Sequence, residues 1–95
     1  MNVEVAGRVV TFIRSLPPEP RKALRRALSE LEHERGDIRP LEGELEDFYR
    51  LRVGRYRAIF QYYVAGRQRN IRCVYAASRS IIYEIFAQQM RELLG

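Results

Sequence analysis

Residues 47–60 change the spacing of apolar residues from that of a helix to that of a strand. Alternate residues of an extended chain point to opposite sides, which puts Tyr49, Leu51 and Val53 together on one side. Gly54-Arg55 then fits a two-residue hairpin loop, with glycine where the backbone needs a positive φ. Because so short a loop fixes which residues face each other, the segment predicts an antiparallel hairpin in one register.

The predicted hairpin has one apolar face and one basic face. The apolar face pairs Tyr49 with Phe60, Leu51 with Ala58, and Val53 with Tyr56. On the other face Arg52 stands opposite Arg57, and two like charges across a strand pair cost a few tenths of a kcal/mol to about 1 kcal/mol. This cost indicates that the arginines are kept for a reason other than stability.

The remaining elements follow from the apolar spacing and from the positions of proline and glycine. Before the hairpin we expect a short strand over residues 2–5, a helix that Pro17 and Pro18 stop, and a second helix from near Pro20 to Gly36. A connecting loop over residues 37–46 then leads into the hairpin. After the hairpin we expect a loop over residues 65–69, a third central strand over residues 70–76, and a final helix from about Ser78. This order predicts a single small α+β domain over residues 1–95, with an N-terminal strand, a two-helix hairpin, a three-stranded antiparallel meander and a C-terminal helix.

Each expected element has a face suited to the core. The apolar helical positions are Val9, Phe12, Ile13 and Leu16 in the first helix, Ala23, Leu24, Ala27, Leu28 and Leu31 in the second, and Ile82, Ile85, Phe86, Met90 and Leu93 in the last. In the third central strand, alternation groups Ile71, Cys73 and Tyr75 against Arg72 and Val74.

Several kinds of protein are excluded by what the chain lacks. A single cysteine, Cys73, and a single histidine, His33, form neither an internal disulfide nor a Cys/His zinc site, so we expect no metal and no cofactor. The common nucleotide-binding, metalloprotease and hydrolase motifs do not occur. Without a membrane-length apolar run or a secretory signal, we expect a cytoplasmic protein that does not contact membranes. His33 is expected to be an exposed surface residue.

The distribution of charge points to a polyanionic partner. The net charge is +5, although arginine enrichment alone could also reflect a GC-rich genome. Residues 48–83 contain no Asp or Glu and eight arginines, which are Arg50, Arg52, Arg55, Arg57, Arg67, Arg69, Arg72 and Arg79. An ordinary solvated surface mixes charges of both signs, so this segment indicates an anion-binding face.

Five residues are candidates for a common site. Arg50, Arg52 and Arg57 share the basic face of the hairpin, and Arg79 and Tyr83 are four residues apart on the expected final helix. Guanidinium groups bind phosphate oxygens through paired donors, and a tyrosine ring can stack on a nucleic-acid base. The alternative is a solvated sheet face against which the tyrosine simply packs.

Three segments resemble the RelE/ParE superfamily of toxins from bacterial and archaeal toxin–antitoxin pairs. They are residues 41–43 (LEG), residues 48–60 (FYRLRVGRYRAIF) and Arg79-x-x-x-Tyr83-Glu84. The resemblance implies a RelE-like fold and a cognate antitoxin protein that wraps the toxin, giving a hetero-oligomer. For the RelE branch it implies a ribosome-dependent, metal-independent endoribonuclease that cleaves messenger RNA when the ribose 2′-hydroxyl attacks the adjacent phosphate.

The resemblance also assigns roles by position. It implies that Arg57, Arg79 and Tyr83 are catalytic and that the RNA-binding residues are Arg50, Arg52, Arg55 and Arg72. Arg57 would bind the phosphate, and Tyr83 would stack on the base or assist proton transfer.

Two departures from the RelE pattern leave other functions open. In the RelE pattern a catalytic arginine lies six residues before the tyrosine, and Ala77 occupies that position in this sequence. Arg79 would therefore have to replace it. The basic strand residues are arginines, which do not readily act as general bases. The alternatives are a ParE-like toxin that inhibits DNA gyrase and a catalytically inactive RelE-like binding protein.

Overall fold

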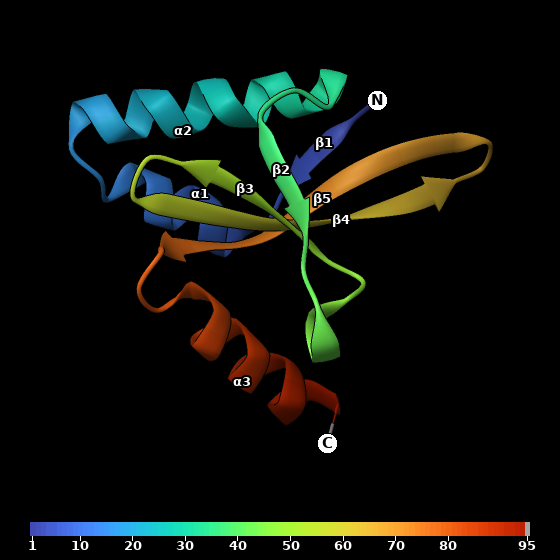
Figure 1. Ribbon diagram of the computed structural model, residues 1–95. Helices are drawn as coiled ribbons and strands as arrows, with labels where there is room; N and C mark the ends of the chain where they lie inside the picture. Colours follow the sequence, from blue (N-terminus) through green and yellow to red (C-terminus); the bar gives the residue numbers. More distant parts are fainter. Residues whose placement is uncertain (95) are drawn as a thin grey trace.

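The computed structural model describes the backbone of residues 1–94 and the side chains of residues 1–92. The elements in chain order are β1 (Val3–Val5), α1 (Gly7–Arg14), α2 (Pro18–Glu30), the 3-10 helix η1 (Leu31–His33), β2 (Asp37–Pro40), the 3-10 helix η2 (Gly43–Leu45), β3 (Tyr49–Val53), β4 (Tyr56–Ala65), β5 (Gln68–Ser78) and α3 (Ile82–Leu94). The strands form one sheet in the order β1-β5-β4-β3-β2 (Figure 1). Helices α1 and α2 pack on one face and α3 on the other, which confirms the α+β class.

The β3–β4 hairpin has the predicted register. Tyr49 pairs with Phe60, Leu51 with Ala58, Arg52 with Arg57, and Val53 with Tyr56. Gly54 has a φ of +58°, as the two-residue turn requires. The apolar face of the hairpin packs under α1 and α2, so the basic face is on the α3 side of the sheet.

The prediction of a loop over residues 37–46 is wrong. Residues 37–40 form β2, an edge strand that pairs antiparallel with β3, and residues 43–45 form η2. Pro40 interrupts the strand pattern in the sequence, but an edge strand tolerates a missing N–H on its open side. The pairing buries part of Ile38 against the core beside Leu51. The predicted meander therefore gains a fourth antiparallel strand.

A β-bulge in β5 overturns the predicted side of Tyr75. The register between β4 and β5 shifts so that Ile59 pairs with Tyr75 and Phe60 with Cys73, which leaves Val74 as the extra residue. Val74 and Tyr75 consequently both pack on the α3 side, whereas Ile71 and Cys73 pack on the α1 and α2 side. The strand is also longer than predicted, and only residues 66–67 remain in its turn.

The boundaries of two helices differ from the prediction. α2 begins at Pro18, because a proline suits the first helical turn, and ends at Glu30 before η1. α3 begins at Ile82 and not near Ser78, because β5 continues to Ser78 and residues 79–81 form a turn. Arg79 therefore precedes α3 and does not share a helical face with Tyr83.

Gly36 ends the turn between η1 and β2 instead of ending α2. Its φ of +129° disfavours any side chain, and a Cβ atom there would lie 2.8 Å from Cδ1 of the buried Leu51. This position fixes how β2 enters the sheet.

Two apolar clusters hold the layers together. The first, between the sheet and α1 and α2, buries Leu24, Leu51 and Phe60, and the second, under α3, buries Phe86. Each such side chain contributes about 1.5–3 kcal/mol when removed from water. Ala23, predicted to pack, is exposed, and the predicted packing of Leu93 falls outside the described side chains. Within residues 1–94, no helix has the length and apolar character of a membrane span.

Candidate nucleic-acid interface

A hollow of about 580 Å³ lies where the β3–β4 turn meets the end of β5. We call it the arginine hollow, and its lining residues are Arg52, Gly54, Arg55, Tyr56, Ser78, Arg79 and Ser80. Arginine and serine side chains provide N–H and O–H donors, and no carboxylate is among these described residues to compete for them. The hollow therefore suits an anion with several acceptor oxygens, such as a phosphate group.

A larger cavity of about 800 Å³ lies between β1, α1 and α2. Its lining includes the apolar side chains Val10, Ile13 and Leu28 together with Arg25 and Glu32, which carry opposite charges. None of the eight arginines of residues 48–83 is among its lining residues. Its greater volume therefore does not make it the better site for a polyanion.

Backbone contacts join the two segments that form the arginine hollow. The Arg79 N–H donates to the carbonyl oxygen of Arg55 over 2.9 Å. Tyr56, directly after the β3–β4 turn, pairs with Ser78 at the end of β5. Arg55 and Arg79 are 24 positions apart in the sequence, and these contacts hold them at one place.

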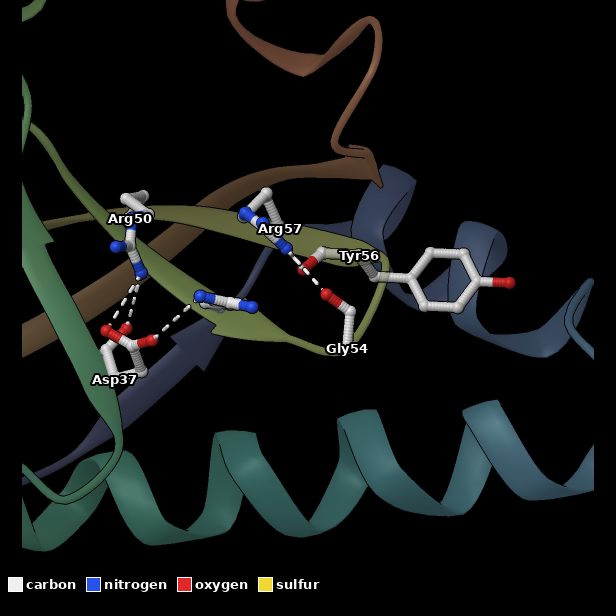
Figure 2. Close-up of polar contacts among 6 residues, drawn as sticks. Asp37, Arg50, Gly54, Tyr56 and Arg57 are labelled. Carbon is white, nitrogen blue, oxygen red and sulfur yellow. Dashed lines mark hydrogen bonds and ion pairs between the residues drawn. The ribbon is translucent and has the colours of Figure 1, made fainter.

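Arg57 is a buried neighbour of residues that line the hollow. Its Nη1 atom donates to the carbonyl oxygens of Gly54 and Tyr56, each over 2.8 Å, and only 9% of the residue is exposed (Figure 2). The carbonyl oxygens are the negative ends of peptide dipoles, so they partly offset the cost of holding a cation beside Arg52. Gly54 and Tyr56 line the hollow, whereas Arg57 does not.

Asp37 on β2 binds the other two arginines of the hairpin's basic face (Figure 2). Arg50 Nη1 donates to the backbone oxygen of Asp37 over 2.9 Å and to Oδ1 over 3.1 Å, and its side chain is 13% exposed. Arg52 Nη1 is 3.9 Å from Oδ2, and its side chain is 54% exposed. Arg50 is thus held inside the sheet face, while Arg52 remains accessible at the hollow.

Arg72 lies away from the arginine hollow, six residues before Ser78 on β5, or about 20 Å along an extended strand. Its Nε atom donates to Glu4 over 3.0 Å, and its guanidinium carbon lies 4.6 Å from the ring centre of Tyr63. A hydrogen bond from Tyr63 and, as the second cause, one from Arg72 lower the pKa of the Glu4 carboxyl. The hydrogen bond between Tyr63 and Glu4 also raises the pKa of the Tyr63 hydroxyl. The structure does not bring Arg72 together with the other predicted RNA-binding residues.

Tyr83 is the second residue of α3. It is half-buried and packs against the apolar cluster under α3, and it does not line the hollow. His33 is exposed, as predicted, and its Nε2 lies 3.1 Å from Glu32. The hollow therefore unites three of the seven predicted site residues, namely Arg52, Arg55 and Arg79.

Some residues at the site were missed in the sequence. Ser78 and Ser80 line the hollow, and their position on either side of Arg79 was the available signal. Arg39 lies on the same basic sheet face, because β2 pairs it with Arg50. Asp37 was placed in a loop, so nothing in the sequence indicated that it would bind Arg50.

Carboxylates from outside residues 48–83 reach several of the eight arginines. Glu4, Glu34 and Asp37 supply them, and the arginines that they pair with are Arg50, Arg52, Arg69 and Arg72. Arg55 and Arg79 form no ion pair with a carboxylate among the described side chains. Among the described side chains, two of the four arginines of this segment that pair with no carboxylate, Arg55 and Arg79, therefore line the hollow.

Neither a protein-family model nor a curated protein matches the sequence. Solved structures are similar in fold. A chain of the archaeal RelE-RelB complex from Pyrococcus horikoshii OT3 is 29% identical with a TM-score of 0.62, over 82% of this chain and 93% of that chain. A chain of the RelB-RelE antitoxin-toxin complex from Methanococcus jannaschii is 25% identical with a TM-score of 0.61, over 87% and 98%.

The YoeB/ParE toxin from Agrobacterium tumefaciens is 10% identical, with a TM-score of 0.66 over 83% of this chain and 99% of that chain, and at this identity shows the fold alone. All three similarities extend over more than four fifths of this chain. The chain therefore has a RelE/ParE-superfamily toxin fold, and this similarity supports a toxin of a toxin–antitoxin system.

Proposed function

We propose that this toxin acts on RNA and that the arginine hollow binds an RNA phosphate. The observation that carries the proposal is the hollow itself, where Arg52, Arg55 and Arg79 meet two serine hydroxyls with no carboxylate among the described lining residues. Like charges that line one hollow repel one another in the free protein, and among the described carboxylates only Asp37, 3.9 Å from Arg52, offsets this. A bound phosphate removes that repulsion and gains charge-assisted hydrogen bonds.

The reaction that fits this site is cleavage of messenger RNA on the ribosome. The ribose 2′-hydroxyl gives its proton to a solvent water molecule, its oxygen attacks the adjacent phosphorus, and the bond from phosphorus to the 5′-oxygen of the next nucleotide breaks. The leaving 5′-oxygen takes a proton from solvent, so the products are a 2′,3′-cyclic phosphate and a 5′-hydroxyl. Negative charge grows on the non-bridging phosphate oxygens, so Arg55 and Arg79 stabilise the transition state more than the ground state. Tyr83 is proposed to stack on the neighbouring base.

A second candidate function is inhibition of DNA gyrase or simple binding without cleavage. The observation in its favour is that none of the described residues that line the hollow readily accepts a proton at neutral pH. The hollow would then bind a phosphate or a carboxylate of the target without chemistry.

Expression in a bacterial host distinguishes these functions. Wild-type protein should stop growth, and mapping of RNA 5′ ends should show new cuts within translated messages. Arg79→Met removes one guanidinium group from the hollow and should reduce cutting by about 100-fold, as loss of one transition-state donor does. Arg67→Met, at the far β4–β5 turn, is the matched control and should cut like wild type.

The contrary results are equally specific. Growth arrest with intact messages and loss of DNA supercoiling would replace the nuclease with a gyrase inhibitor. Full cutting by Arg79→Met would remove the hollow from the mechanism.

We further propose that a cognate antitoxin binds this chain in the cytoplasm and neutralises it. The solved complexes from M. jannaschii and P. horikoshii pair RelE with RelB, which supports a partner of that kind. An acidic partner would complement the net charge of +5. Co-expression with the product of the neighbouring reading frame should restore growth and give a complex that copurifies. Persistent growth arrest would contradict this pairing.

A further inference from the structure

We propose that Arg57 is a positioning residue, which holds the β3–β4 turn so that Arg55 and Arg79 can bind one phosphate, and that it does not contact RNA itself. The inference rests on the proposed function, because it concerns the same hollow. It replaces the direct phosphate contact that the family resemblance implies for Arg57.

The hydrogen bonds of Arg57 enclose Arg55 on both sides. The two carbonyl oxygens that accept from Nη1 belong to Gly54 and Tyr56, the residues directly before and after Arg55. The Gly54 carbonyl belongs to the peptide before Arg55, and the Tyr56 carbonyl belongs to the peptide between Tyr56 and Arg57. One guanidinium group therefore restrains two peptide planes of the turn, and the plane between them is held by the bond from the Arg79 N–H to the Arg55 carbonyl oxygen. These contacts, drawn in Figure 2, restrain the backbone of the turn that carries Arg55.

The same contact reaches Arg79 through one further bond. The carbonyl oxygen of Arg55 accepts from the Arg79 N–H over 2.9 Å, so an orderly turn also fixes the start of the segment that carries Arg79. Arg57 also pairs across the strands with Arg52 on β3 and with Ala77 on β5. Its position in the sheet thus links the two segments that form the hollow.

Burial separates this role from direct binding. Arg57 is 9% exposed, whereas Arg55 and Arg79 are exposed and line the hollow. The Nη1 atom of Arg57 already donates to the carbonyl oxygens of Gly54 and Tyr56, and Arg57 is not among the residues that line the hollow.

The test compares the salt dependence of RNA binding among matched variants. The probe is a short single-stranded RNA with 2′-O-methyl groups, which cannot be cleaved by 2′-hydroxyl attack. Each direct arginine–phosphate contact contributes about 0.7 to the slope of log affinity against log salt for single strands. Arg79→Met and Arg55→Met should each reduce the slope by about that amount, and Arg67→Met should leave slope and affinity unchanged.

Arg57→Met should weaken RNA binding about tenfold, because the turn is no longer ordered before binding. It should not change the slope of log affinity against log salt, because no phosphate contact is removed. Arg57→Lys keeps the charge and N–H donors, so it should recover most of the affinity and keep the wild-type slope. Amide hydrogen exchange of Arg79 in the free protein should accelerate at least tenfold in Arg57→Met and much less in Arg57→Lys. Should Arg57→Met not fold, Arg57→Gln, which removes the charge but keeps an N–H donor for the turn carbonyls, carries both measurements.

A drop in slope for either Arg57 variant equal to that for Arg79→Met would mean that Arg57 contacts phosphate, and would overturn the inference. Unchanged affinity and unchanged Arg79 exchange in Arg57→Met would overturn it as well. Failure of the wild-type protein to bind the RNA would instead refute the proposed function. Arg79 exchange, which needs no RNA, would then still decide whether Arg57 orders the turn.

Discussion

Replacing Asp37 by asparagine should change stability and RNA affinity in opposite directions. The Asp37 carboxylate accepts from the largely buried Arg50 over 3.1 Å and lies 3.9 Å from Arg52, which lines the hollow. Asparagine has the same shape and keeps an acceptor oxygen, and the bond from Arg50 to the backbone oxygen of residue 37 is unaffected. The substitution therefore removes one negative charge and little else.

The magnitude follows from the geometry. A hydrogen bond between charged groups stabilises by about 1.5–3 kcal/mol, and an exposed ion pair by about 0.2–1 kcal/mol. Arg50 is 13% exposed and Asp37 is 45% exposed, so the pair falls between these limits. Because asparagine retains the neutral hydrogen bond, we expect a loss of about 1 kcal/mol, or a fall in Tm of about 5 °C for a domain of this size.

RNA affinity should rise because the hollow becomes more positive. One unit charge acting through water over roughly 10 Å contributes about 0.4 kcal/mol, which corresponds to about a twofold gain in affinity at low salt. Thermal unfolding and RNA titration of Asp37→Asn give the two values. Glu30→Gln is the matched control, because Glu30 forms an exposed pair with Arg35 and should change neither value measurably. A variant that is both less stable and weaker in binding would refute the reasoning, since Asp37 would then support the hollow and not oppose it.

Three further predictions concern the rest of the fold. The pKa of Glu4 is lower in the folded protein than its ordinary value of 4.5, so ionised Glu4 stabilises the fold above pH 4.5 and this stabilisation is lost as the pH falls. In Glu4→Gln, Tm should therefore fall less steeply with decreasing pH than in the wild type. An equally steep fall would contradict this. Burial raises the pKa of the Cys73 thiol to about 12, so a disulfide reagent at pH 8 should label it only as fast as the protein unfolds. Rapid labelling in native buffer would argue against that burial. Gly36→Ala puts a side chain on a residue with a φ of +129° and a methyl group 2.8 Å from the buried Leu51. The free energy of unfolding in urea should fall by about 1–3 kcal/mol. An unchanged value would mean that the turn can move.

Sequence reasoning succeeded where structure depends on near neighbours. The β3–β4 register follows from a two-residue turn and alternate apolar residues, all within residues 49–60. β2 was missed because its strand character comes from pairing with β3, and its four residues, with Pro40 at the end, carry no strand pattern of their own. The bulge at Val74 was missed for a related reason, since the β4–β5 register determines it and no local residue signals it.

The site shows the same division. The sequence indicated a segment rich in arginine and free of acids, but the partner of each arginine depends on which distant residue the fold brings near. Asp37 accepts a hydrogen bond from Arg50, which is 13 positions away in the sequence. Glu4 accepts one from Arg72, which is 68 positions away. The orientation of Arg57 toward carbonyl oxygens depends on the turn geometry. Alternation could place Arg57 on the basic face but could not distinguish an exposed guanidinium group from a buried one.

A map of amide chemical-shift changes during titration with single-stranded RNA tests the central claim most directly. We expect the largest changes on residues 52, 54–56 and 78–80, which line the arginine hollow, and we expect Arg79→Met to need more RNA to produce them. The basic residues of α2, such as Arg25 and Arg26, provide the internal comparison, because they are exposed on the opposite layer. Changes concentrated on α2, with the hollow undisturbed, would contradict the account.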